Sequence, residues 1–229
     1  MIIGKPITLK TFEAKYEDFT PEQKKLYATD DDKRRYIAQM AMEQISQTDE
    51  EALMMANSLK ANFGNGISTL LRIYNATGET LSWKRDYSWY GRFYSEADPL
   101  IQNGQWSVLL HVRRTGFLWL TAGSSGGLVY ETESKFPFNK SQAPAQVFMG
   151  WSTPYWFGTN RCQVKIGADM VSGLCDDKNP ASHQPGLLEQ PGQNQRWESA
   201  EVPALWAMSF IGNDSSAQVK IVLQRIKAS

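Results

Sequence analysis

The sequence has little of what most catalytic and metal sites need. It contains two histidines and two cysteines in 229 residues, without the C-x-x-C or H-x-x-x-H spacing that predicts a zinc site. His111 lies in the strand-like stretch LLHVRR, and His183 lies in a proline-rich stretch without the order of a hydrolytic triad. We therefore expect no metal, no cofactor and no catalytic residue. An enzyme that uses His111 as a general base is the least favoured alternative.

Charge of one sign and long apolar runs are missing as well. Lys and Arg number 24, as do Asp and Glu, so no overall field attracts nucleic acid. No stretch approaches the roughly 20 apolar residues of a membrane-spanning helix, and the apolar run before Gly4 is too short for a signal peptide. These absences predict a cytoplasmic protein. Cys162 and Cys175 could be bonded or free, and that compartment favours free thiols.

The spacing of apolar residues changes near Gly64. Before it, apolar residues recur every three or four positions, which is typical of amphipathic helices. The aspartates at 30–32 suit a first helical turn, the segment at 48–51 (TDEE) has the sequence of a capping box, and Gly64 suits a C-cap. The pattern therefore predicts an N-terminal α-helical hairpin within residues 1–64. Its apolar face must be buried, so we expect it to pack on the rest of the chain.

From residue 65 to the end, the period of the pattern is two. Short runs rich in β-branched and aromatic residues, such as STLLRIY and QWSVLLHVR, are separated by Gly, Asn, Pro and Ser. This spacing predicts an antiparallel β-sandwich over residues 65–229. The predicted fold class is thus mainly β with an N-terminal α-helical hairpin (α+β).

Aromatic residues are concentrated in two segments, WKRDYSWYGRFY at 83–94 and GWSTPYWFGTN at 150–160. Alternate side chains of a strand face opposite sides, so neither segment can bury all its rings on one face. Exposed Tyr and Trp rings suit a membrane–water interface, stack on sugars and attract quaternary ammonium groups. An ordinary core with a few surface rings is the alternative.

The sequence from about residue 62 to the end resembles the plant 23-kDa jasmonate-induced proteins. The resemblance is carried by NFGNGISTLLRIYNATGETL, NGQWSVLLHVRRTG, LVYET and WSTPYW. Members of this family respond to stress and wounding, so the resemblance implies a role in plant defence.

A more distant resemblance is to the actinoporin and aegerolysin-like β-sandwich cytolysins and the fungal fruit-body lectins. Ser152, Pro154 and Tyr155 match the Ser-x-Pro-Tyr segment beside the phosphocholine pocket of actinoporins. The tyrosines that follow this segment in actinoporins are absent here, which argues against a phosphocholine-selective pocket and leaves a sugar or a different lipid headgroup open. Actinoporins form pores with a detachable N-terminal helix. The predicted hairpin could be that element or a permanent cover, and its short connection favours a cover.

These observations predict a non-catalytic binding protein that recognises a glycan or a lipid headgroup at one end of the sandwich. A membrane-active, pore-forming cytolysin at a membrane surface is the alternative, and a homo-oligomer is left open. We expect Ser152 to donate hydrogen bonds and the rings beside it to stack on the ligand. The predicted ligand-binding residues are Trp89, Tyr90, Trp151, Ser152, Pro154, Tyr155 and Trp156.

Overall fold

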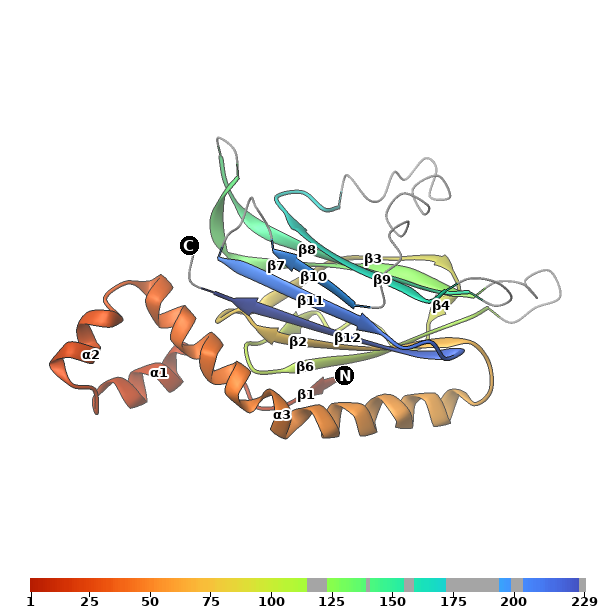
Figure 1. Cartoon of the computed structure of the whole chain (residues 1–229), viewed down its shortest axis with the longest axis horizontal. Helices are drawn as coiled ribbons and strands as arrows, with labels where there is room; N and C mark the ends of the chain where they lie inside the picture. The colour runs from red at the N-terminus through yellow and green to blue at the C-terminus, as the bar shows by residue number, and fades with distance from the viewer. Residues whose placement is uncertain (115–122, 139–140, 155–158, 172–193, 199–203, 227–229) are drawn as a thin grey trace.

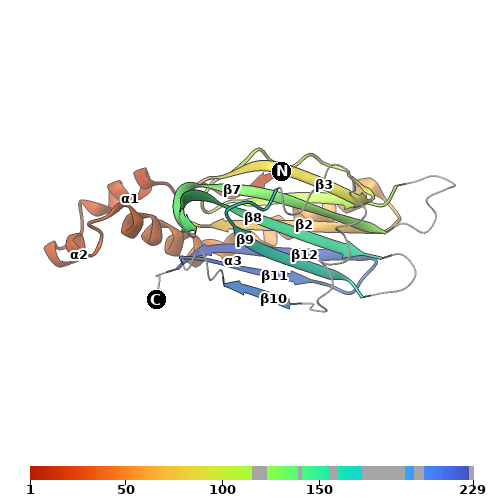
Figure 2. The ribbon, with the colours of Figure 1, turned by 90° about the horizontal axis from the view of Figure 1, so that it is seen from above.

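Two β-sheets lie face to face, and a long helix covers the outer face of one of them (Figures 1 and 2). The structure is a computed structural model that describes residues 1–114, 123–138, 141–154, 159–171, 194–198 and 204–226. Within these ranges the fold is mainly β with N-terminal helices, as predicted.

Three helices precede the second strand: α1 (Leu9–Tyr16), α2 (Pro21–Leu26) and α3 (Asp30–Phe63). Helix α3 begins at a capping box, in which the Thr29 side chain accepts a hydrogen bond from the backbone N–H of Asp32. The three acidic residues of its first turn lie at the positive end of the helix dipole. Gly64 ends the helix with a positive φ of 86°. The predicted start near Asp30 and end at Gly64 are therefore confirmed as the ends of α3, whereas α1 and α2 were not predicted.

The predicted hairpin, however, is wrong. Helix α3 runs without a break through residues 48–51, where the sequence predicts a turn. Thr48 hydrogen-bonds the carbonyl of Ile45 through its hydroxyl, which also accepts the indole N–H of Trp106 at 2.9 Å. The carboxylate of Asp49 pairs with Arg72 and Lys220. These side chains have the sequence of a local cap but bind the sheet below the helix, so the helix continues.

The first sheet contains seven described strands and is mixed. Its central strands β2 and β12 are parallel, with Ser68 opposite Ser216, whereas its other pairs are antiparallel. The predicted antiparallel pairing is therefore confirmed for the described strand pairs, except for β2 with β12. In spatial order the strands are β1 (Ile2–Ile3), β6 (Trp106–Val112), β2 (Ser68–Ala76), β12 (Ser216–Arg225), β11 (Leu205–Ile211) and β10 (Asn194–Glu198), with β4 (Arg92–Phe93) also paired to β6.

The second sheet contains five described strands, all antiparallel. In spatial order they are β5 (Leu100–Ile101), β3 (Leu81–Tyr90), β7 (Ser124–Phe138), β8 (Ser141–Thr153) and β9 (Arg161–Gly167). Strand β3 carries most of the first aromatic segment and the end of β8 carries the start of the second, with β7 between the two strands.

The core between the sheets is formed by alternate residues of the strands. Along β12, for example, Val219, Ile221 and Leu223 are buried in it, as the period of two requires. Tyr130 and Trp151 of the second sheet are the largest side chains in this layer. The alternation that predicted the strands therefore also places the core.

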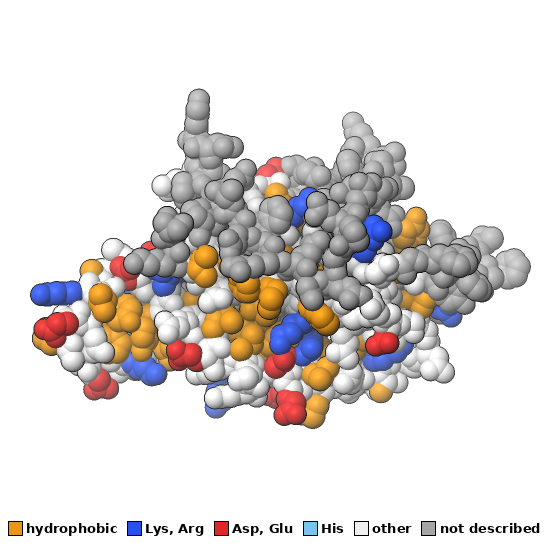
Figure 3. All heavy atoms as spheres, in the orientation of Figure 1, with side chains coloured by type: hydrophobic (Ala, Val, Ile, Leu, Met, Phe, Trp, Pro, Cys, Tyr) orange, Lys and Arg blue, Asp and Glu red, His pale blue; other side chains and the backbone are white. Residues whose placement is uncertain are grey.

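A second core lies between the first sheet and the helices. Helix α3 packs against β2, β6 and β12, where Tyr74 and Trp106 are fully buried with ring centroids 4.7 Å apart. The Tyr74 hydroxyl donates to the carbonyl of Ala41 at 2.6 Å. On the neighbouring strand β11, Met208 and Phe210 are 40% and 46% exposed. Figure 3 shows hydrophobic side chains gathered on this face.

Asp49 is expected to be a main polar attachment of α3 to the sheet. Replacing it (Asp49→Ala) leaves the nearly buried Arg72 without its carboxylate, and should lower the free energy of unfolding by about 1–3 kcal/mol. Denaturant titration measures this. The exposed neighbour Glu50 is the control, and Glu50→Ala should change stability by less than about 0.5 kcal/mol. Equal losses for the two variants would contradict the assigned role.

Candidate functional site

The two aromatic segments meet at the end of the sandwich where α3 ends (Figure 1). In the strand register, Tyr90 of β3 lies opposite Ser125 of β7, which lies opposite Ser152 of β8. Neighbouring strands are about 4.8 Å apart, so Tyr90 and Ser152 are separated by roughly 10 Å across one row. Tyr90 is 44% exposed and Ser152 is half-buried. The structure therefore brings together two of the predicted site residues from segments distant in the sequence.

Trp89 lies beside this row and is partly buried. Its ring packs against Val129 and Phe148 on the outer face of the second sheet. Its indole N–H is buried and finds no hydrogen-bond acceptor in the described part of the chain. Gly127 lies beneath the ring: an added Cβ there would lie 2.6 Å from Phe148 and 3.4 Å from Trp89. A side chain at position 127 would therefore displace the ring of Phe148, against which Trp89 packs.

Trp151 lies on the opposite face of β8, in the core between the sheets. It is fully buried, and its ring contacts those of His111 and Phe93 at centroid distances of 5.2 and 5.8 Å. It supports the end of β8 from inside and has no surface for a ligand in this conformation. Pro154 is half-buried directly after β8. Tyr155 and Trp156, the remaining predicted site residues, lie outside the described residues.

His111 is buried at the centre of a chain of hydrogen bonds that joins five strands. Its ring nitrogens bond the hydroxyls of Ser88 at 3.0 Å and Ser124 at 2.8 Å. The Ser124 hydroxyl lies 2.7 Å from that of Thr69, which in turn lies 3.0 Å from that of Thr153. Thr153 directly follows Ser152. The chain therefore fixes the ends of β3 and β8, on which the candidate site is built.

The environment of His111 favours the neutral imidazole. Burial, followed by the charge of Arg114, lowers the pKa of His111 to about 3. Both ring nitrogens bond serines, and no carboxylate orients the ring in the part of the chain that the structure describes. A residue in this state positions strands rather than accepting protons near neutral pH. His183 lies outside the described residues.

Cys162 carries a free thiol in the core between the sheets. Burial raises the pKa of this thiol to about 11, so it stays protonated and is a poor nucleophile. Cys175 lies outside the described residues. Among the residues that the structure describes, no three His, Cys, Asp or Glu side chains are grouped as metal ligands.

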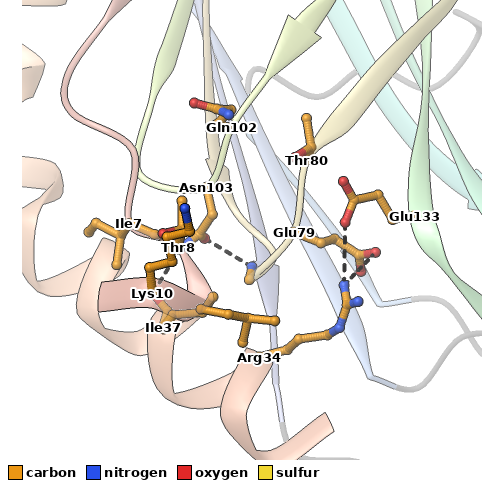
Figure 4. A pocket seen from close by; sticks show the side chains of 12 residues that line it. Ile7, Thr8, Lys10, Arg34, Ile37, Glu79, Thr80, Gln102, Asn103 and Glu133 are labelled. Carbon is orange, nitrogen blue, oxygen red and sulfur yellow. Dashed lines mark hydrogen bonds and ion pairs between the residues drawn. The ribbon is translucent and has the colours of Figure 1, made fainter. Parts of the chain in front are cut away.

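A cavity of about 390 Å³ lies at the other end of the sandwich, between the N-terminal helices and the turn after β2 (Figure 4). Beside it, the buried carboxylate of Glu79 pairs with Arg34 and Arg225. Arg225 also pairs with Asp31 of α3 at 2.6 Å. Asn103 accepts the backbone N–H of Gly78 at 2.9 Å and donates to backbone carbonyls of the helical region.

Sequence reasoning missed this ionic cluster, although one signal was present. Arg225 is in phase with the inward-facing residues of β12, and an inward-facing guanidinium requires a buried acceptor. The charges of this cluster are paired within the chain. The cluster is therefore better suited to hold the helices on the sheets than to bind a ligand.

The fold defined by these observations is a two-sheet β-sandwich whose outer face is covered by an N-terminal helix. A family model described as Nakanori-like protein matches residues 7–226, and the chain belongs to this family. It is also 35% identical over 168 residues to the 23 kDa jasmonate-induced protein of Hordeum vulgare, over 72% of this chain and 71% of that protein. The resemblance to that family is therefore confirmed.

One solved structure agrees with this assignment at the level of the fold. The crystal structure of the lipid-binding protein Nakanori matches with a TM-score of 0.75 at 24% identity, covering 98% of this chain and 100% of that chain. A lectin of Xerocomus chrysenteron gives a TM-score of 0.43 at 12% identity, covering 69% of this chain and 99% of that chain. The particular likeness to actinoporins stays a prediction.

None of the helices in the described residues combines the length and the apolar character needed to cross a membrane.

Replacing His111 should weaken the fold and change its pH dependence. His111→Gln disrupts the hydroxyl chain and should lower the free energy of unfolding by about 1–3 kcal/mol at neutral pH. In the wild type, the folded-state pKa of about 3 lies below the ordinary 6.5. The unfolded chain therefore binds the extra proton between these values, and stability falls as pH decreases through this window.

Denaturant titrations at several pH values measure this dependence, which His111→Gln should reduce relative to the wild type. His183→Gln, which removes the only other imidazole in the sequence, is the matched control. An unchanged slope in His111→Gln would contradict the neutral, buried state of the ring.

Proposed function

We propose that the protein is a non-catalytic binding protein that recognises a lipid headgroup at the aromatic end of the sandwich. The observation that carries the proposal is the row formed by Tyr90, Ser125 and Ser152 across three strands, with Trp89 beside it. The row combines the exposed ring of Tyr90 and the hydroxyl of Ser152 on one face. The strand ends behind them are fixed by the chain of hydrogen bonds centred on His111.

The chemistry of these groups suits a headgroup. A ring face attracts a quaternary ammonium group by about 0.5–2 kcal/mol, and the hydroxyl of Ser152 could donate to a phosphate or an ester oxygen. The ring of Trp89 lies beside them, but its indole N–H is buried and faces no ligand in this conformation. In the proposal, Pro154 shapes the edge of the site, Tyr155 and Trp156 contribute further rings, and the buried Trp151 acts as a support. A glycan could use the same groups and is the alternative ligand.

The comparisons support this proposal in two ways. Nakanori, which shares the fold and gives the family its name, is described as a lipid-binding protein. The barley relative is described as jasmonate-induced, which supports our proposal of a role in a stress or defence response. The cytoplasmic location stays a prediction.

The contacts of α3 favour binding without insertion into the membrane. To enter a bilayer as a detached element, α3 would have to expose the fully buried Tyr74 and Trp106 and break the ion pairs of Asp49. Burying one large side chain contributes about 1.5–3 kcal/mol, so detachment is costly. A permanent cover therefore suits the geometry better than a detachable helix.

Tyr90→Ala tests the proposed site. Co-sedimentation with phosphatidylcholine vesicles should show an affinity about tenfold lower than wild type, because one cation–π contact is lost. Trp83→Ala is a matched control, since Trp83 is 41% exposed on the same strand but lies towards its other end. This variant should bind like the wild type.

A glycan array and a dye-leakage assay on the same three proteins separate the alternatives. Glycan binding that is lost in Tyr90→Ala, without vesicle binding, would identify a lectin that uses this site. Leakage from vesicles would support a cytolysin. Equal binding of every ligand by Tyr90→Ala, Trp83→Ala and the wild type would contradict the assignment of the site.

A further inference from the structure

A second cavity lies at the same end of the sandwich as the aromatic row, but on the side of the first sheet. Its volume is about 410 Å³, and it is an open pocket lined by the end of α3, the loop before β2, the residue after β6 and the turn between β11 and β12. No carboxylate is among its lining residues, all of which the structure describes: Lys60, Asn65, Gly66, Ile67, Arg113, Ser215 and Ser216.

Lys60 differs from other partly buried cations of the protein. Arg34 and Arg225 share the carboxylate of Glu79, and Arg72 and Lys220 share that of Asp49. Lys60 has no ion pair with a described residue. Its ammonium group donates to the carbonyl of Gly66 at 2.7 Å and lies 5.2 Å from the centroid of the Phe63 ring, and neither contact supplies a full negative charge.

The second cation, Arg113, approaches the same loop. Its backbone N–H donates to the carbonyl of Ile67 at 3.1 Å, which holds the start of its side chain beside the cavity. Its Nε lies 3.4 Å from the position that a Cβ of Gly66 would occupy. Gly66 has a φ of 132°, which other residues rarely adopt. A Cβ at that distance would make an ordinary van der Waals contact, so it is the backbone conformation that requires glycine at position 66.

The electrostatics of this arrangement favour an anion. Burial lowers the pKa of Lys60 because its charge is desolvated without a carboxylate to compensate. The carbonyl of Gly66 supplies only a partial negative charge. An anionic group in the cavity would supply the missing counter-charge, and the hydroxyls of Ser215 and Ser216 could donate to its oxygen atoms.

We propose that this cavity binds a phosphate monoester, with Lys60 and Arg113 as its charged ligands. A phosphate offers several oxygen atoms to a guanidinium and an ammonium group at once, and charge-assisted hydrogen bonds of this kind are the strong ones. The phosphate could belong to a lipid headgroup or to a soluble compound. The site shares no residue with the aromatic row, so it is independent of the function proposed above.

An experiment with two arms tests the site and distinguishes a soluble phosphate compound from a lipid headgroup. In the first, calorimetry with inositol hexakisphosphate as the probe measures binding to the full chain in low-salt buffer. In the second, the protein is sedimented with phosphatidylcholine vesicles with and without phosphatidic acid. Lys60→Met and Arg113→Met should each weaken binding of the recognised probe about tenfold or more, because a charge-assisted contact is lost.

Three further measurements make the result specific. Lys60→Arg keeps the charge and a donor, and should retain most of the affinity. Lys25→Met removes an exposed lysine of α2 at the distant end of the molecule, and should bind like the wild type. The unfolding temperature of each variant without probe shows whether it is folded, and the probe should raise that temperature more in the wild type than in Lys60→Met.

The outcomes separate the two proposed sites. Binding of inositol hexakisphosphate alone supports the cavity with a soluble source, and a requirement for phosphatidic acid supports it with a lipid source. Equal affinities of the wild type, Lys60→Met and Arg113→Met, or no binding of either probe, would overturn the proposal. A loss of phosphatidylcholine binding in Tyr90→Ala would still report on the aromatic row alone.

Discussion

A buried carboxylate must be compensated, and the position of Glu79 sets how the helices and the two sheets fit together. Arg225 reaches it from the end of β12, Arg34 reaches it from α3, and the backbone N–H of Ser134 donates to it from β7. Replacing Glu79 would leave the buried guanidinium of Arg225 with only the more exposed Asp31 as a counter-charge, and breaking a buried ion pair in this way costs several kcal/mol. The orientation of α3 on the sandwich therefore depends on this cluster as well as on apolar packing.

Much of the fold follows from local patterns in the sequence. The period of two predicted the strands, and the aspartates at 30–32 and Gly64 marked the ends of α3. The predicted break at Thr48 failed because its local capping pattern competes with contacts from far along the chain, namely those of Trp106 with Thr48 and of Lys220 with Asp49. Such contacts leave no trace in a short window of sequence.

The candidate site could be predicted only in part. Aromatic density pointed to Tyr90 and the segment at 150–160, and strand register then placed Tyr90 and Ser152 in one row. Alternation along β8 turns Trp151 inwards and Ser152 outwards. The phosphate cavity gave no sequence signal, because Lys60 and Arg113 are 53 residues apart (113 − 60) and meet only where a helix end and a strand end converge.

The parallel pairing of β2 with β12 has a consequence for the order in which the protein can be completed. Strand β12 lies between β2 and β11 in the first sheet, yet it is the last described strand of the chain. During synthesis, β2 therefore has an open edge until the residues of β12 have been made, and open strand edges are templates for pairing with other chains. Strand β12 is thus a central part of the sheet, and a chain without it would lose the connection between β2 and β11.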